Sequence, residues 1–330
     1  MFHSSDSVLL DVRSPGEFAA GHVPGSSSLP LFTDEERAEV GTLYVQSGRD
    51  TAVRRGLEIV GPKLVNLVDT AREILQGRPA HVMCWRGGMR SASVTWLLTT
   101  AGITATAVRG GYKSYRRWVL NTLEYPWKLI VIAGRTGSAK TDVLQQLSTL
   151  GIQTIDLEAL ARHKGSVFGN LTGETQPTTE QVMNDMAEVL RTFDVTQPVV
   201  VEDESRKIGT VALYEPFFLR LVSSPVIVLE ADEEDRATYL VQEYASIPNS
   251  SIIERLNIIA KRLGGDRLRL AVEAIREGRR ADAVVHVLDY YDRTYDYSLG
   301  RRQAPRLGTV LVDYHRLCVT ARRILELLPR

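Results

Sequence analysis

One cysteine has the surroundings of a nucleophile. Cys84 follows a short apolar run, residues 80–83, and two glycines and two arginines come within the next six residues. The glycines let the backbone curl tightly, so that consecutive backbone N–H groups can turn towards the sulfur. With Arg86 and Arg90 nearby, these groups favour the thiolate, the form of cysteine that attacks electrophiles or carries sulfur-type atoms. A purely structural buried cysteine is the alternative, and it leaves the arginines and glycines unexplained.

The remaining residues of this loop are the candidate anion site. Ser91 is also expected to cap a helix over residues 92–100. The loop residues after the cysteine are Trp85, Arg86, Gly87, Gly88, Met89, Arg90 and Ser91.

A second loop has the composition of a phosphate-binding loop (P-loop). An apolar strand is predicted at 129–133 and an amphipathic helix at 142–150, and the order strand, glycine loop, Lys-Thr and helix is the context such a loop needs. Backbone N–H groups would hold the anion, Lys140 would neutralise phosphate oxygens, and the Thr141 hydroxyl could bind Mg²⁺. The loop residues are Gly134, Arg135, Thr136, Gly137, Ser138, Ala139, Lys140 and Thr141.

Ala139 departs from the usual pattern, in which a glycine precedes the lysine. A left-handed backbone at this position would cost alanine about 1 kcal/mol or somewhat more. We predict that the loop keeps its form with Ala139 in an allowed backbone region.

Acidic residues follow another predicted strand, residues 198–201. In P-loop proteins a carboxylate at this place holds Mg²⁺ or its waters. Asp203 is the first candidate and Glu202 the second; a solvated cluster at the strand end is the alternative. The segment consists of Glu202, Asp203, Glu204, Ser205 and Arg206.

Strands and helices alternate through both halves of the chain, which indicates an α/β fold with open, largely parallel sheets. In the first half we predict strands at 8–12, 80–83 and 104–108, a helix opened by Ser14, Pro15 and Glu17, and a helix over 64–74. Pro126 breaks the pattern within 121–127, where we place the domain boundary. Beyond the P-loop we predict strands at 225–230 and 307–312 and helices at 232–245, 251–263, 267–277 and 314–328.

Composition limits the classes of function. The 330 residues contain forty basic and forty acidic side chains, so RNA would have to be bound by local patches. Two cysteines provide neither a disulfide framework nor a zinc ligand set, which fits a reducing compartment. The start has no signal-peptide pattern and no apolar run approaches about 20 residues, so we expect a cytoplasmic protein without a membrane. Four tyrosines could stack on bases or belong to a core: Tyr290, Tyr291, Tyr295 and Tyr297.

The first half resembles a rhodanese domain. The resemblance rests on the cysteine loop and on the segments Asp-Val-Arg-Ser-Pro-x-Glu-Phe at 11–18, Gly-His-Val-Pro-Gly at 21–25 and Arg-Gly-Gly-Tyr at 109–112. Five residues separate Cys84 from Arg90, one more than in many sulfur-transferring rhodaneses. Cysteine phosphatases and arsenate reductases use a loop of that size. A phosphatase or arsenate reductase fused to a P-loop kinase is therefore an alternative function, and a non-catalytic RNA-binding regulator is a third.

A rhodanese domain followed by a P-loop domain resembles the bacterial tRNA 2-selenouridine synthase family. Further segments carry the resemblance, at 34–44, 163–169, 176–178, 201–206, 208–209 and 290–296. It implies a rhodanese domain at 1–122 and a P-loop domain with a C-terminal helical extension at 128–330.

The resemblance also implies a two-stage reaction on tRNA that carries 5-substituted 2-thiouridine at the wobble position. Geranyl diphosphate first alkylates the sulfur, and selenium from selenophosphate then displaces geranylthiol. Cys84 would carry selenium as a perselenide, stabilised by the rest of its loop. Residues 134–141 with Asp203 would bind geranyl diphosphate, with Mg²⁺ at Thr141 and Asp203. An enzyme that makes selenophosphate is an expected partner.

Overall fold

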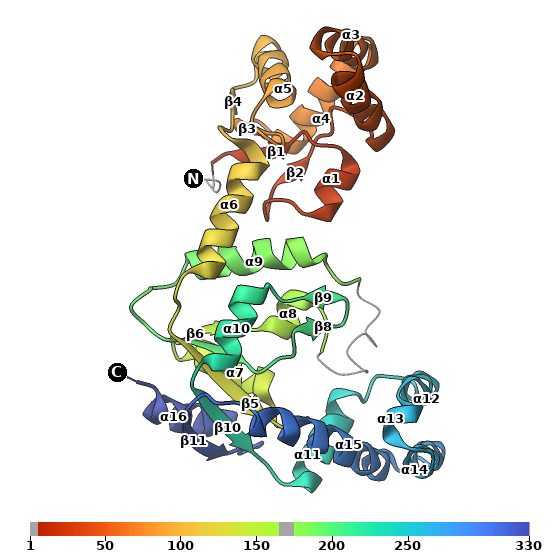
Figure 1. The fold of residues 1–330 in the computed structure, drawn as a ribbon, viewed down its shortest axis with the longest axis vertical. Coiled ribbons are helices and arrows are strands. Elements are labelled where there is room, and N and C mark those ends of the chain that lie inside the picture. The colour runs from red at the N-terminus through yellow and green to blue at the C-terminus, as the bar shows by residue number, and fades with distance from the viewer. Residues whose placement is uncertain (1–5, 165–174, 330) are drawn as a thin grey trace. The chain divides into compact units, whose positions relative to one another are not determined.

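The computed structural model describes residues 6–164 and 175–329, which form two compact units (Figure 1). The first unit contains the chain up to Thr122 together with Met183–Glu188, and the second contains Leu123–Val182 and the chain from Val189 onward. Among the described helices, none has both the length and the apolarity needed to cross a bilayer.

The first unit is built on a four-stranded parallel sheet in the order β2-β1-β3-β4. Its strands are β1 (Val8–Asp11), β2 (Ser27–Ser28), β3 (Ala80–Met83) and β4 (Ala105–Ala107). Three of these strands were predicted. Their apolar side chains pack with helix α4 into one core that also contains Cys84, so the sheet fixes the position of the sulfur.

Helices surround this sheet, and only some of them were predicted. The capping box of Ser14 and Glu17 opens α1 (Pro15–Ala20), with Pro15 at its first position. Helix α4 (Leu64–Leu75) matches the predicted apolar period. The other helices of the unit are α2 (Asp34–Gln46), α3 (Arg49–Val60), the 3₁₀ turn η1 (Gly61–Lys63), α5 (Met89–Thr100) and α6 (Gly111–Glu124).

The second unit contains a five-stranded parallel sheet in the order β11-β10-β5-β7-β6. The strands are β5 (Leu129–Gly134), β6 (Gln153–Ile155), β7 (Val199–Glu202), β10 (Val226–Glu230) and β11 (Arg306–Leu311). Helices α7 (Lys140–Thr149) and α16 (Leu317–Leu327) pack on it and share its apolar core. Between β6 and β10 the described residues also form α8 (Leu157–Ala161), α9 (Thr179–Arg191), the β8–β9 hairpin (Lys207–Ile208 and Val211–Ala212) and α10 (Glu215–Ser223).

A helical extension with its own apolar core follows β10 (Figure 1). It consists of α11 (Glu233–Glu243), α12 (Asn249–Ile258), α13 (Ala260–Leu263), α14 (Gly265–Arg276) and α15 (Arg280–Gly300). The single helix predicted at 251–263 is in fact two, α12 and α13. Tyr290 and Tyr291 pack against the core of the extension, which favours the core interpretation over base stacking for these two tyrosines.

Candidate functional site

Cys84 lies directly after β3 and is only 3% exposed. Its Sγ is 3.2 Å from the Ser91 hydroxyl, and the backbone N–H groups of Ser91, Arg86 and Gly88 donate to the sulfur. The loop therefore turns its N–H groups towards the sulfur, as its glycines predicted.

The prediction that Ser91 caps the following helix is wrong. Helix α5 begins at Met89 with Gly88 as its N-cap, so Ser91 lies in the first turn. Its hydroxyl is free to face the cysteine, and its oxygen also lies 3.1 Å from the Gly88 carbonyl oxygen, a second acceptor for the one hydroxyl proton. The glycine pair tightens the loop enough to start the helix three residues earlier than expected.

Hydrogen bonds decide the protonation of this thiol. Burial raises the pKa of Cys84, but the hydrogen bonds from the Ser91 hydroxyl and from the three backbone N–H groups lower it by more. The net pKa lies below the ordinary value for cysteine, which favours the thiolate.

The arginines of the loop do not act as the sequence suggested. Arg90 forms an ion pair with Glu17 at 2.7 Å, and this pair lowers the pKa of Glu17 against the opposing effect of burial. Arg86 approaches the sulfur with its backbone N–H, while its side chain is exposed. Trp85 and Met89 are also exposed.

The Arg-Gly-Gly-Tyr segment closes the cysteine loop from the other side. Gly111 has φ +56°, and a Cβ atom there would collide with the Cys84 carbonyl. The Tyr112 N–H donates to that carbonyl at 2.9 Å, and the Lys113 N–H donates to the Trp85 carbonyl at 2.8 Å. The start of α6 therefore fixes the backbone on which the sulfur sits.

The Asp-Val-Arg segment supports the same arrangement. Arg13 and Asp11 form a fully buried ion pair at 2.7 Å, and Arg13 also donates to the Gly21 carbonyl. The guanidinium lies 3.7 Å from the centre of the Tyr112 ring. These motif residues position the loop without facing the sulfur themselves.

The P-loop connects β5 to α7, whose first residue is Lys140. Gly137 has φ +86°, and a Cβ there would come 3.0 Å from the Arg236 carbonyl. The Lys140 ammonium donates to the Gly134 carbonyl at 3.0 Å, which holds the charge beside the loop. The helix N-terminus and the lysine together form a site suited to an anion.

Ala139 precedes α7 with φ 52° and ψ 34°. These angles lie within the small left-handed region that remains open to L-residues. The loop thus keeps its form with Ala139 in an allowed region, as predicted, but in the region that carries an energetic cost for alanine.

Helices α11 and α15 fasten the P-loop. Arg236 donates to the Thr136 carbonyl at 3.1 Å and forms a bidentate pair with Asp292 at 2.7 and 2.8 Å. Arg135 pairs with Asp296 at 2.7 Å. Both aspartates belong to the Tyr-Tyr-Asp-x-x-Tyr-Asp segment, so that segment holds the loop. No motif or spacing in the sequence pointed to Arg236.

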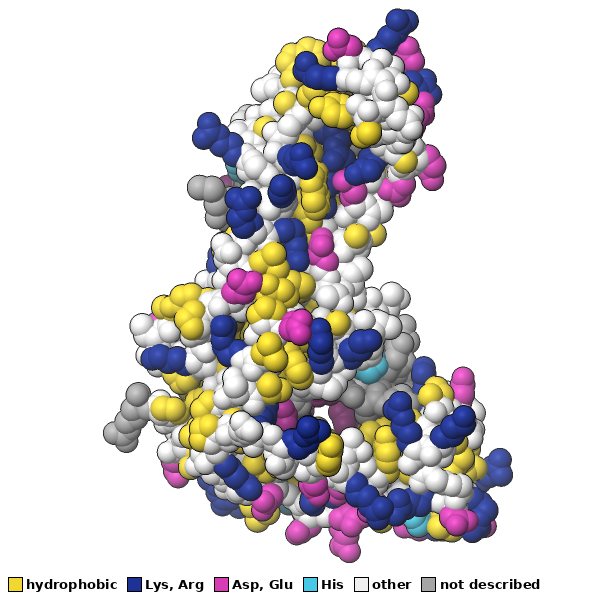
Figure 2. All heavy atoms as spheres, in the orientation of Figure 1, with side chains coloured by type: hydrophobic (Ala, Val, Ile, Leu, Met, Phe, Trp, Pro, Cys, Tyr) yellow, Lys and Arg dark blue, Asp and Glu magenta, His cyan; other side chains and the backbone are white. Residues whose placement is uncertain are grey.

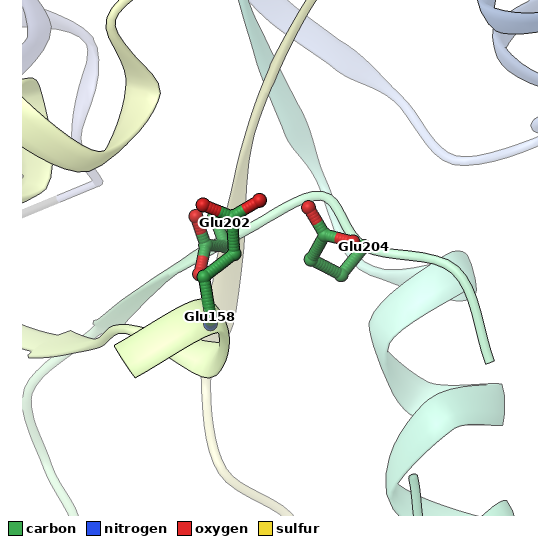
Figure 3. Close-up of side chains that lie close together, drawn as sticks. All are labelled: Glu158, Glu202 and Glu204. Carbon is green, nitrogen blue, oxygen red and sulfur yellow. The ribbon is translucent and has the colours of Figure 1, made fainter. Parts of the chain in front are cut away.

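Three carboxylates, those of Glu158, Glu202 and Glu204, lie close together (Figure 3). Ligand oxygens of Glu158, Glu202 and Glu204 lie within 4.8 Å of one another. Glu202 is fully buried: one of its oxygens accepts from the Glu158 N–H at 2.8 Å, and the other has no hydrogen-bond partner among residues 6–164 and 175–329. The Thr141 hydroxyl donates to Glu158 at 3.4 Å.

The other residues of the acidic segment have partners of their own. Asp203, the first metal candidate, forms an ion pair at 3.0 Å with Arg302, whose side chain is buried. Ser205 donates to the Lys207 carbonyl, and Arg206 lies 3.5 Å from Glu215. Among these contacts, the carboxylate that reaches Thr141 is Glu158, which sequence reasoning missed because it follows a different strand, β6.

Burial raises the pKa values of the carboxyl groups at the end of β7. For Glu204 burial acts together with the charge of Glu158 and raises the pKa to about 8. For Glu202 the same two causes raise it well above its ordinary value. Burial also raises the pKa of Asp203, against the opposing charges of Arg302 and Lys140.

The P-loop, Glu158, Asp203 and Glu204 line one open cavity of about 2300 Å³ in the second unit, a volume that includes its open mouth. Figure 2 shows a hollow in this unit with acidic side chains inside it. Tyr295, Arg301 and Arg302 of the C-terminal part line it as well. The cavity is large enough for a phosphorylated ligand together with part of a second reactant.

Comparison with known proteins gives the family. Residues 127–310 match the model of the tRNA 2-selenouridine synthase AAA domain, and residues 1–117 match the rhodanese-like domain. The chain belongs to the tRNA 2-selenouridine synthase family. A tRNA 2-selenouridine synthase of Marinobacter nauticus is 33% identical, covering 93% of this chain and 91% of that protein. One of Alcanivorax borkumensis is 34% identical, covering 96% and 95%.

Some segments that resemble the tRNA 2-selenouridine synthase family have a structural role. The Gln176 side chain donates to the Ala161 and Ile208 carbonyls, both at 3.0 Å, and accepts from the Thr210 N–H at 2.8 Å. It thereby fastens the β8–β9 hairpin beside α8. Of the 163–169 segment, residues 165–169 lie outside the described residues.

Proposed function

We propose that this chain replaces sulfur by selenium in a 2-thiouridine of tRNA. The observation that carries the proposal is that relatives with this name align over more than nine tenths of both chains. A cysteine with a lowered pKa and a fastened P-loop supply the two kinds of chemistry that the conversion requires. The alternative of a phosphatase or arsenate reductase fused to a kinase rests on the length of the cysteine loop alone.

The P-loop would serve the first stage. The wobble nucleoside is a 5-substituted 2-thiouridine, whose sulfur is a poor leaving group until it is alkylated. In our proposal this sulfur attacks the first carbon of geranyl diphosphate, the C–O bond breaks, and diphosphate leaves with the electron pair. The N–H groups of residues 134–141 and the Lys140 ammonium would hold that leaving group.

A Mg²⁺ ion fits the residues beside the loop. Thr141 and Glu158 supply hard oxygen donors, and the buried Glu202 oxygen without a partner is the kind of atom that a cation would satisfy. When bound, the ion would neutralise charge on the leaving diphosphate. We assign the metal to Thr141 with Glu158 in preference to Asp203, because Arg302 already neutralises Asp203.

Cys84 would serve the second stage. Its thiolate can open selenophosphate at either of two atoms. Attack at selenium forms the S–Se bond of a perselenide, and the phosphorus keeps the electron pair and leaves as phosphite. Attack at phosphorus forms an S–P bond and releases hydroselenide, and water later frees phosphate. In the hydroselenide route selenium attacks C2 and geranylthiol leaves. In the perselenide route the outer selenium attacks C2 and geranylthiol leaves; a thiol reductant then attacks the Cys84 sulfur, so that the S–Se bond breaks with its electron pair on selenium, and a second thiol frees Cys84 from the resulting disulfide. The phosphorus product shows which atom Cys84 attacks.

Omitting one co-substrate at a time tests the order of the stages. With geranyl diphosphate alone, thiolated tRNA should accumulate S-geranyl-2-thiouridine; selenophosphate added afterwards should convert it to 2-selenouridine. Nucleoside mass spectrometry measures both products. Formation of 2-selenouridine from selenophosphate alone, without a geranylated intermediate, would contradict the proposed route. Selenophosphate would come from a separate enzyme that makes it.

A further inference from the structure

A second cavity lies in the helical extension. It measures about 670 Å³ including its open mouth. Apolar side chains of α11, α12, α14 and α15 line it, among them Leu240, Ile252, Leu256, Ile275, Val284 and Val287. One charged residue, Arg280, also reaches the wall, but its guanidinium is bound to Asn249 and to backbone carbonyls, including that of Ile247 at 2.8 Å. The walls therefore present almost only hydrocarbon.

This cavity begins at the P-loop. Thr136, Leu240, Tyr244 and Tyr291 line both the apolar cavity and the larger cavity that contains the loop. Leu240 packs so closely on the loop that a Cβ at Gly137 would come 3.1 Å from its side chain. An anion site and an apolar chamber thus share one wall.

Such a pair of sites suits an amphiphile with an anionic head and a hydrocarbon tail. A nucleotide base has polar edges that lose hydrogen bonds when buried, and these walls offer few partners for them. Each buried methylene group, in contrast, gains free energy by leaving water. The wall shared with the P-loop lets both parts of one molecule bind at once.

We infer that the apolar cavity binds the hydrocarbon tail of a prenyl diphosphate whose diphosphate lies in the P-loop, and that its depth selects the length of the tail. The inference rests on the proposed function, and it adds the residues that recognise the donor. Val284 and Ile252 form part of the wall that limits the tail.

Two neighbouring valines of α15 test the inference. Val284 lines the cavity, whereas Val285 is 36% exposed and is not among the residues that line it. Calorimetry on the full chain would compare inorganic diphosphate with geranyl diphosphate. The wild type should bind geranyl diphosphate at least tenfold more tightly. Val284→Phe should lose that preference and keep its affinity for inorganic diphosphate within twofold, which also shows that the variant is folded. Val285→Phe should match the wild type.

A change in the opposite direction guards against a variant that fails to fold. Ile252→Ala enlarges the cavity and should shift the preference from the ten-carbon towards a fifteen-carbon prenyl diphosphate. Equal wild-type affinities for inorganic and geranyl diphosphate, or an unchanged preference in both Val284→Phe and Ile252→Ala, would overturn the inference.

Measuring the modified nucleosides formed on tRNA distinguishes a failure of this inference from a failure of the proposed function. If Val284→Phe geranylates thiolated tRNA with an unchanged KM for geranyl diphosphate, the tail site is wrong and the function stands. If the wild type forms no S-geranyl product, yet Val284→Phe abolishes the preference for the geranyl tail, the function is wrong and the tail site stands.

Discussion

The thiolate of Cys84 depends on hydrogen bonds more than on the charge of a neighbouring arginine. Arg90 is neutralised by Glu17, while the Ser91 hydroxyl and three backbone N–H groups face the sulfur. A hydrogen bond to a charged group contributes about 1.5–3 kcal/mol, so Ser91 alone has a measurable share in the pKa of the cysteine.

Ser91→Ala should raise the pKa of Cys84, because it removes one of the hydrogen bonds that stabilise the thiolate. The thiolate is the reactive form, so the pH at which selenation reaches half its maximal rate should move upward together with the pKa. The measurement is the rate of conversion of S-geranylated tRNA as a function of pH. Ser93 is exposed on the same helix, so Ser93→Ala is the control and should leave the pH dependence unchanged. A pH–rate profile for Ser91→Ala that matches the wild type would count against the role of the Ser91 hydroxyl.

Ala139 carries a cost that glycine would remove. A left-handed backbone costs an L-residue about 1–2 kcal/mol, and a glycine would avoid this cost. Part of the benefit is lost because glycine also makes the unfolded chain more flexible and so lowers its free energy. Ala139→Gly should therefore raise the free energy of unfolding by about 0.5–1 kcal/mol, measured by urea denaturation. As a control, Ala159→Gly in the right-handed helix α8 should lower it by about 0.5–1 kcal/mol. A lower free energy of unfolding for Ala139→Gly than for the wild type would show that Ala139 is not strained.

At the scale of elements, α15 joins the P-loop to the helical extension. Asp292 and Asp296 of this helix hold Arg236 and Arg135 beside the loop, and Tyr291 of the same helix lines the apolar cavity. A motif that could have contacted RNA therefore positions the loop and its neighbouring chamber.

Glu204, which follows β7, should make the free energy of unfolding depend on pH. Burial and the charge of Glu158 raise the folded-state pKa of Glu204 to about 8, so the folded protein holds a proton that the unfolded chain releases near its ordinary value. The stabilisation is fully present below pH 4.5 and is lost as the pH rises through 8, on the order of a few kcal/mol.

Glu204→Gln should flatten this dependence. Urea denaturation between pH 5 and 8.5, with a chelator present, would show the wild type losing stability and the variant losing distinctly less. Glu254→Gln, at an exposed position of α12, should behave as the wild type. Equal slopes for wild type and Glu204→Gln would show that Glu204 is not protonated in the folded protein.

The sequence predicted those strands and loops whose residue pattern along the chain is enough to determine them. The apolar runs 80–83 and 129–133 are strands, and the glycine loops after them form the two sites. Helix α2 was missed because none of its residues is buried, which leaves it without an apolar face. Ser91 and Glu158 were misjudged or missed because their roles come from contacts between separate elements.

At the scale of the whole molecule, one chain combines a cysteine loop and a P-loop on two separate parallel sheets. Forty basic and forty acidic residues give no overall attraction for RNA, so recognition of tRNA must come from local surfaces. Because each unit builds its own site, we expect the two stages to be separable by mutation of one site at a time.

Exchange of tRNA between two variants tests this account most directly. Cys84→Ser should geranylate thiolated tRNA and stop there. Lys140→Ala should be deficient in geranylation, because its loop lacks the charge that holds the diphosphate. Given purified S-geranylated tRNA from the first variant and selenophosphate, Lys140→Ala should form 2-selenouridine at a rate close to that of the wild type, as measured by nucleoside mass spectrometry. If Cys84→Ser cannot geranylate, or if Lys140→Ala cannot use the geranylated tRNA, the division of the reaction between these two sites is wrong.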